Sequence, residues 1–349
     1  MSIKKYLSFS LLISLLTLVF LSKPTLAASA LDLKIYPPVA YLSVKPGAGI
    51  NHLVKLSNQG LYTLEIAPTL VNFQTDGKSG AVILEQSSDF TYLNLEADPA
   101  NWGKSFILKP GEEKNLNFVI ALPSLVPEKE FHLSILFQAR QVAQGSSHQQ
   151  QAILSAIVAS NVVLAVSNEG QNRGELVIEQ FNVPKLADSL IGFSFSALLK
   201  NIGSNATPIT GQIKISHWPA AQAEIYQLYP DMVLAGSQRL ARTMSETELK
   251  SLTQLEESKA VLAANGEDYA ARKAQLIREK LKSQVFYKKS FLLGAYDLEL
   301  AVGEQTSSKR VIVLPFSLLF IVLILPILYT LFSLLQKLTQ KVILKKPDN

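Results

Sequence analysis

Four histidines are the side chains best suited to catalysis or metal binding in this sequence of 349 residues, which contains no cysteine. They are His52, His132, His148 and His217. None lies in an H-E-x-x-H motif or at the spacing of metal ligands, and His52 and His132 fall inside strand-like stretches. Without cysteine, thiol catalysis and thiolate metal sites are excluded. We therefore expect structural or surface histidines, with no metal and no cofactor.

Carboxylate pairs are the second source of chemistry. Glu112 and Glu113 adjoin one turn, and Glu128 and Glu130 flank another. Glycoside hydrolysis needs two carboxyl groups facing each other across a cleft, roughly 5 to 9.5 Å apart. Neighbours on a surface turn do not meet that requirement, so solvated charged turns are expected and the protein is predicted not to be an enzyme.

Three other stretches have a chemical and a structural interpretation. The sequence TDGKSG at residues 75–80 holds two glycines and a lysine, but between two strands it indicates a hairpin loop rather than a phosphate loop. Trp102 and Trp218 each follow or precede a turn, where a tryptophan either fills the core or offers a platform for a sugar ring. The core interpretation is favoured, and neither G-x-S-x-G nor G-x-x-x-x-G-K-[ST] occurs.

The N-terminus indicates export. Two lysines precede an apolar stretch from Tyr6 to Leu21, and the small residues TLAASA follow. This order is typical of a secretory signal peptide, here residues 1–27, with cleavage after Ala27 or after Ala30. The alternative is an uncleaved anchor helix.

The C-terminus indicates a membrane anchor. Residues 311–335 carry no charge and are long enough to cross a bilayer, with a kink expected at Pro326. The tail, residues 336–349, contains four lysines, which favours the cytoplasmic side. With a cleaved signal peptide, the chain reads as a single-pass type I protein of the cell membrane with an extracellular ectodomain.

The formal charge of +5 belongs to the two ends. Three of the 33 basic residues precede Ala28 and four follow Val311, which leaves 26 basic against 27 acidic residues between them. Such a balance does not indicate a nucleic-acid-binding protein. An exported chain of sandwich domains without disulfides favours a bacterial envelope.

Between its ends the chain alternates short apolar runs with turn signals, which predicts an all-β ectodomain. Pro46-Gly47 before one run and Asn58-x-Gly60 after it return as Pro110-Gly111 and as Asn201-x-Gly203. Such steps reverse a chain at strand ends. We expect two tandem immunoglobulin-like β-sandwiches, residues 28–168 and 174–306, joined by the polar stretch 167–174.

One segment, residues 243–282, breaks the β rhythm. Ser245-x-x-Glu248 is a capping-box signature, and leucines at 249, 252, 255 and 262 mark one helix that ends at Asn265-Gly266. A second helix carries Tyr269, Leu276, Ile277 and Leu281 on one stripe. The predicted helical hairpin either packs on itself and the sandwich or protrudes as an arm toward a partner or the membrane.

The order of segments, together with YPPVAYLSVKPGAGINHLVKLSNQG, DGKSGAVILE, FILKPGEEKNLNFVIALP and VASNVVLAV, resembles the WxL-interacting proteins of bacterial surfaces. That resemblance covers most of the chain outside residues 243–282. It implies a first domain similar to the immunoglobulin-like fold of pilus chaperones, associated with peptidoglycan, and a second domain that meets host or partner ligands. No ligand-contacting residue can be transferred position by position.

Three functions remain open on the sequence. The leading expectation is a non-enzymatic, membrane-anchored surface protein that binds cell-wall peptidoglycan or another surface protein. The second is an extracytoplasmic chaperone-like protein that offers a strand edge to surface proteins during their assembly. The third is a membrane-tethered enzyme or sensor, against which the short tail counts.

Overall fold

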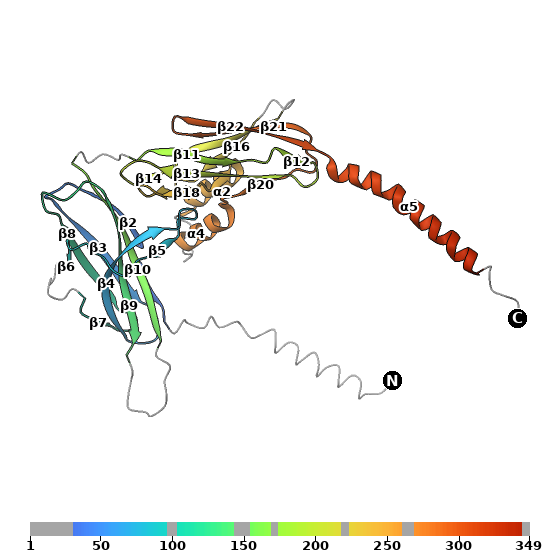
Figure 1. Cartoon of the computed structure of the whole chain (residues 1–349). Helices are drawn as coiled ribbons and strands as arrows, with labels where there is room; N and C mark the ends of the chain where they lie inside the picture. The colour runs from blue at the N-terminus through green and yellow to red at the C-terminus, as the bar shows by residue number, and fades with distance from the viewer. Residues whose placement is uncertain are drawn as a thin grey trace, which may run out of the picture.

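A computed structural model describes residues 31–95, 103–142, 154–168, 174–217, 223–259 and 269–343. These residues form two β-rich units and a long C-terminal helix (Figure 1). We name residues 31–168 the N-terminal unit and residues 174–314 the C-terminal unit; the predicted domain limits remain predictions. The predicted signal peptide, residues 1–27, and both cleavage sites lie outside the described residues.

The N-terminal unit consists of two sheets, with strand orders β1-β3-β8-β6 and β2-β10-β9-β4-β5; β7 also pairs with β4. Among the described strands of this unit, only β2 and β10 form a parallel pair. When the strands are lettered in chain order, the first sheet corresponds to the ABED sheet of an immunoglobulin sandwich and the second to its GFC sheet, with β2 added beside β10. The strands are β1 (Leu33–Tyr36), β2 (Val39–Val44), β3 (Gly49–Asn58), β4 (Leu64–Thr75), β5 (Val82–Leu84), β6 (Leu93–Leu95), β7 (Phe106–Leu108), β8 (Glu113–Ala121), β9 (Glu130–Gln141) and β10 (Ser155–Val166).

The core of this unit lies between its two sheets because alternate residues of each strand point inward. Leu56 and Phe118 from one sheet and Phe137 and Leu164 from the other have no exposed surface. The rings of Phe118 and Phe137 meet edge to face across the core, with centroids 6.3 Å apart. Burying each such side chain stabilises the fold by about 2 to 3 kcal/mol before entropy is subtracted.

Asn58 and Asn201 occupy equivalent strand ends in the two units, as the repeated Asn-x-Gly step predicts. Neither step uses a positive φ, because no described residue other than glycine has one and Gly60 and Gly203 are not among the glycines that do. Both side chains are fully buried and connect separate loops by hydrogen bonds. The amide of Asn58 bonds Tyr62 O, Leu108 O and Gly60 N, and that of Asn201 bonds Asn205 O, Val233 O and Gly203 N.

The C-terminal unit repeats the design. One sheet has the order β11-β13-β18, with β20 also on β13, and the other the order β12-β22-β21-β15-β16-β19; β14 pairs with β17. A second buried core, which includes Phe195 and Leu298, lies within this unit. The strands are β11 (Leu176–Asn182), β12 (Leu186–Asp188), β13 (Phe193–Asn201), β14 (Thr207–Pro208), β15 (Gly211–His217), β16 (Glu224–Leu228), β17 (Met232–Val233), β18 (Gln238–Leu240), β19 (Thr243–Ser245), β20 (Val285–Tyr287), β21 (Gly294–Val302) and β22 (Gln305–Leu314).

Two helices lie in the segment that breaks the β rhythm, α2 (Glu246–Glu257) and α4 (Tyr269–Lys280). The predicted capping box is confirmed, since the Ser245 side chain accepts from the Glu248 N–H and the Glu248 side chain accepts from the Ser245 N–H. Leu262 and the Asn265-Gly266 step lie outside the described residues.

The segment from β19 to α4 is inserted between β18 and β20, two short strands that pair with neighbouring parts of β13. β18 pairs with residues 198–200 of β13, and β20 pairs with residues 193–195 of the same strand. Between them, Thr243 and Lys282 close the base: Thr243 N donates to Lys282 O at 2.9 Å and Lys282 N to Thr243 O at 3.4 Å. β18 and β20 therefore act as two halves of one strand position along β13.

The apolar C-terminal helix, α5 (Phe316–Ile343), leaves the end of the C-terminal unit (Figure 1). It contains a 22-residue segment, Phe316–Lys337, that is long and apolar enough to span a membrane, and Pro326 lies inside it as expected. The predicted span starts at Val311 and the predicted second domain ends at residue 306, whereas in the structure β22 runs to Leu314 and α5 starts at Phe316. Residues 311–314 belong to β22, where Val311 and Val313 are fully buried in the core. A buried strand and a membrane helix are both apolar, so hydropathy merges them.

Candidate functional site

Three of the four histidines lie in the described residues, and each contacts other groups of the protein. His52 is buried, its Nε2 lies 3.3 Å from Ser160 Oγ, and burial lowers its pKa. His217 lies 2.7 Å from the Leu293 carbonyl oxygen and stacks on Tyr296. His132 contacts Glu130, and His148 lies outside the described residues.

The carboxylates do not come together across a cleft, but one departs from expectation. Glu113 pairs with Lys55, Glu112 accepts from the Lys109 N–H, and Glu128 accepts from Asn168, all at the surface. The Glu130 side chain is only 1% exposed, so the expectation of a solvated turn is wrong there. Within the described ranges, no three His, Asp or Glu side chains gather as a metal site would require.

Glu130 is buried because it joins the two units. Its Oε1 accepts from the Ala235 N–H at 3.0 Å, and its Oε2 accepts a short bond from the Ala206 N–H. On its own side the carboxylate lies 2.6 Å from His132 Nε2. A buried carboxylate is tolerated where donors surround it, so this contact holds the C-terminal unit against the first residue of β9.

An apolar cluster lies beside this carboxylate. Phe73 of β4 and Val163 of β10 pack with Leu234, which precedes the turn at Gly236 in the C-terminal unit. All three side chains are buried, and the Phe73 ring lies 5.4 Å from that of His132. We name these four residues, Glu130, Phe73, Val163 and Leu234, the junction. It also includes the contacts of the loop at residues 75–80 with Arg239 and Leu240.

The TDGKSG stretch forms the hairpin loop that its sequence predicts, and the loop also contacts the C-terminal unit. Asp76 accepts from Ser79 Oγ and from the Lys78 and Gly80 N–H groups, which lowers the pKa of Asp76. The loop's own donors thus satisfy its carboxylate. Lys78 O in turn accepts from the Leu240 N–H at 2.7 Å.

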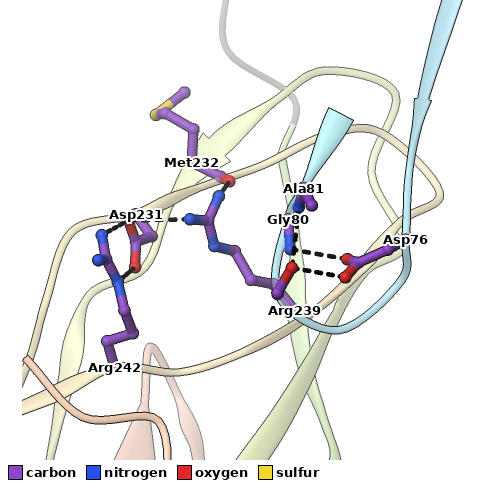
Figure 2. Close-up of polar contacts among 8 residues, drawn as sticks. Asp76, Gly80, Ala81, Asp231, Met232, Arg239 and Arg242 are labelled. Atoms are coloured by element: carbon purple, nitrogen blue, oxygen red, sulfur yellow. Dashed lines mark hydrogen bonds and ion pairs between the residues drawn. The ribbon is translucent and has the colours of Figure 1, made fainter. Parts of the chain in front are cut away.

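Arg239 fills the space against this loop (Figure 2). Gly80 has φ +75°, and a Cβ there would come within 2.6 Å of Arg239 Nη1, so only glycine fits. Arg239 donates to Met232 O at 3.0 Å and pairs with Asp231 at 3.2 Å, while Arg242 binds Asp231 with two bonds of 2.6 Å (Figure 2). The paired arginines make this side of the junction rigid rather than an open anion site.

The second feature is an unpaired edge on β10. β9 pairs with β10 along residues 155–165, whereas β2 covers only residues 161–166 on the other side. Leu154 O accepts from Gln141 N on the β9 side, and Asn161 N donates to Pro38 O on the β2 side. Because these directions alternate along a strand, the N–H and C=O groups of Ser155, Ile157 and Ala159 face away from β9. No described strand pairs with them.

The edge is open because of the chain crossing that precedes β2. Pro37 and Pro38 link β1 in one sheet to β2 in the other, and neither has an N–H to extend the parallel ladder toward Ala159. Ser160 closes the paired part by donating to Pro37 O at 2.8 Å, beside His52. The Pro-Pro step therefore sets where pairing stops.

Exposed apolar side chains continue from the open edge toward the junction. Ile157 is 62% exposed on the outer face of the sheet. Val39 pairs with Asn161 and Tyr41 with Val163, so both β2 side chains share that face; they are 42% and 50% exposed. Burial raises the pKa of Tyr41, and the Arg239 guanidinium opposes that shift. We name Ile157, Val39 and Tyr41 the apolar stripe.

Sequence reasoning missed both features. The alternating pattern of VASNVVLAV predicts a strand but not how much of it finds a partner. Glu130 looks like any turn glutamate until the C-terminal unit, 76 and 105 residues away, supplies its donors. The Pro37-Pro38 step was the one available signal for the open edge. Trp102 and Trp218 lie outside the described residues.

No protein-family model and no curated protein matches the chain. Solved structures do. It is similar to the class 5 fimbriae chaperone CfaA at 12% identity, covering 81% of this chain and 100% of that one, with a TM-score of 0.34. It is also similar to a chaperone–tip adhesion subunit complex, CsuC–CsuE of Acinetobacter baumannii (11%, 81% and 99%, 0.32), and to a Salmonella enterica complex of SafA pilin with the SafB chaperone (9%, 63% and 93%, 0.35). Such low TM-scores carry no argument, so function rests on the geometry above.

Proposed function

We propose that this protein is a non-enzymatic, membrane-anchored, chaperone-like protein that binds an extended segment of another exported protein along the open edge of β10. The observation that carries the proposal is the run Ser155–Ser160, whose outer edge has no described partner strand. Adding a strand to such an edge is a general mode of peptide recognition.

The edge supplies both affinity and selectivity. Three residues face outward, each with one N–H and one C=O, and each hydrogen bond contributes about 0.5 to 1.5 kcal/mol net. The apolar stripe extends beyond these residues, so apolar side chains at alternate positions of the added segment have somewhere to pack. An extended, alternating segment fits this surface better than a folded domain does.

The C-terminal helix supports a membrane location for this activity. α5 has the length and composition of an anchor and is not buried against either unit. A tethered binding edge would meet exported chains before they reach their final location. The type I orientation, with the ectodomain outside, and the resemblance to the WxL-interacting proteins are part of this proposal.

Wall binding was the leading expectation and stays a prediction. Of the carboxylates considered for wall chemistry, Glu113 pairs with Lys55 and the Glu130 side chain is buried. The open edge therefore favours a polypeptide partner over a glycan.

A pair of proline variants tests the edge. Ile157→Pro removes an outward N–H that no described group uses, so the fold should persist while the added strand is blocked. Ala156→Pro removes an N–H that faces β9, so the fold itself should weaken. Comparing their thermal unfolding establishes that any loss of binding in Ile157→Pro is not a loss of structure.

Binding is measured in two stages. A photo-crosslinking side chain at residue 157, with Leu125, a 96% exposed apolar residue, as the control position, should capture a surface protein in intact envelopes only at 157. The captured segment, as a synthetic peptide, should bind Ile157→Pro at least about tenfold more weakly than wild type, equal to about 1.4 kcal/mol. Equal binding, or sedimentation of the wild type with purified sacculi but no captured protein, would overturn the proposal.

A further inference from the structure

Exposed apolar side chains gather where α5 leaves the C-terminal unit. They come from the loop between β12 and β13, the loop between β20 and β21, the end of β22 and the first residue of α5. We name this set the apolar rim, and its members are 37% to 57% exposed: Leu190, Ile191, Phe291, Leu293, Leu314 and Phe316.

The loops of the apolar rim are fixed to one another. Ser189 N donates to Leu314 O, and Leu292 N donates to Ser189 O, each at 3.0 Å. Leu292 itself is fully buried in the core, between the exposed Phe291 and Leu293. The rim side chains are therefore held outward by a defined backbone.

Asp188 ties the rim to the helix. Its Oδ1 accepts from the Leu190 N–H at 2.9 Å and the Ile191 N–H at 3.3 Å, and its Oδ2 accepts from the Ser317 N–H at 2.6 Å. The bond from Ser317 N–H lowers the pKa of Asp188, so the carboxylate is charged at neutral pH. One side chain thus sets the rim at the level of the first turn of α5.

We propose that the apolar rim lies in the lipid interface of the membrane that α5 spans. The proposal rests on α5 being the membrane anchor. If Phe316 enters the bilayer, then Leu190 and Ile191, bonded to the same carboxylate as Ser317, lie at the same depth. Apolar side chains at that level are stabilised by the boundary between headgroups and acyl chains.

The charge around the rim fits the same surface. Lys288 precedes Phe291 and is exposed, and Lys185, also exposed, precedes β12, whereas Lys289 is paired with Glu224. Lysines beside an interfacial apolar group reach toward lipid phosphates while their alkyl chains stay near the boundary. Rim and helix together would hold the C-terminal unit against the bilayer and orient the N-terminal unit.

The absence of cysteine gives a direct test, because every introduced cysteine is a unique labelling site. The full chain is reconstituted in vesicles of phosphatidylethanolamine and phosphatidylglycerol, with an environment-sensitive fluorophore at Ile191→Cys or Phe291→Cys. Glu304→Cys, at the opposite end of the β21–β22 hairpin, is the aqueous control, and Leu323→Cys, inside α5, is the membrane control. All four replaced side chains are exposed, so folding should be unaffected.

We expect nitroxide lipids to quench the probes at 191 and 291 several-fold more than the probe at 304, with blue-shifted emission. Quenching at 323 with none above the 304 level at 191 and 291 would overturn the rim and leave the anchor intact. No quenching at 323 would overturn the anchor itself, and with it the membrane part of the proposed function.

Discussion

At the junction, two backbone N–H groups of the C-terminal unit donate to the Glu130 carboxylate. Replacing Glu130 with alanine removes this acceptor. The N–H groups of Ala206 and Ala235 would lose their acceptor at a position where the wild-type side chain is 1% exposed. An unsatisfied buried donor costs about 1 to 3 kcal/mol, so the two together predict a loss of about 2 to 6 kcal/mol. Water entering the space left by the side chain lowers this, and we expect about 3 kcal/mol.

Urea unfolding of the full chain in detergent micelles measures this loss. The chain has two tryptophans, Trp102 in the N-terminal range and Trp218 in the C-terminal range, so replacing either with phenylalanine leaves one reporter for each unit. With a typical dependence of about 2 kcal/mol per molar urea, 3 kcal/mol is a midpoint shift of about 1.5 M. Because the bonds of Glu130 connect the two units, the unfolding transitions reported by the two tryptophans should also occur at different urea concentrations in Glu130→Ala.

Glu128→Ala is the matched control, since Glu128 is an exposed glutamate two residues earlier that accepts from Asn168 at the surface. Its effect should stay within about 0.5 kcal/mol. Glu130→Gln keeps one acceptor oxygen and should lose about half as much as Glu130→Ala. If Glu130→Ala shifted the midpoint no more than Glu128→Ala, the carboxylate would not be holding the units together.

The other predictions concern the inserted helices, the buried histidine and the hairpin loop. Replacing residues 244–281 with Asn-Gly should remove somewhat less than half of the helical circular dichroism, because α2 and α4 contribute 12 residues each and α5 keeps 28. A cooperative melt should remain, because Thr243 and Lys282 already face each other and, among the described residues of that segment, only Met244 and Leu281 are buried, both outside the main core; an unfolded product would contradict this. The lowered pKa of His52 means that the unfolded chain binds the proton more readily, so stability should be complete above about pH 6.5 and fall as the pH drops below it; a His52→Gln variant with the same pH slope would refute that origin. Gly80→Ala should lower the free energy of unfolding through both backbone strain and a clash with Arg239, whereas Gly77→Ala should show backbone strain alone, because Gly77 also has a positive φ but a Cβ there meets no atom within 4 Å. Equal losses of unfolding free energy in urea would exclude a role for the Arg239 contact.

Local chemistry determined several elements in advance. The capping box at Ser245 starts α2 because its partners lie within one turn, and the hairpin loop at Asp76 satisfies its own carboxylate within four residues. Strands such as β3 and β8 were readable from alternation, since one face of each is buried. These signals work because the interacting groups are close in the sequence.

Other features depended on residues that only folding brings together. Val311 and Val313 read as membrane helix until β21 pairs with them, because apolar composition does not distinguish a lipid neighbour from a protein core. β18 and β20 are too short to recognise until both align on β13. The same holds for Asn201, whose buried amide reaches Val233 over a sequence separation of 32.

The candidate site belongs wholly to this second group. Sequence alternation makes β10 a strand, but its open edge exists because β2 begins pairing only at Asn161, after two prolines that lack the donor. Glu130 is buried only because the C-terminal unit contributes two N–H groups from separate turns. An unused edge and a shared carboxylate are properties of pairing between distant segments, and hydrophobic period or turn chemistry within any one segment carries no information about them.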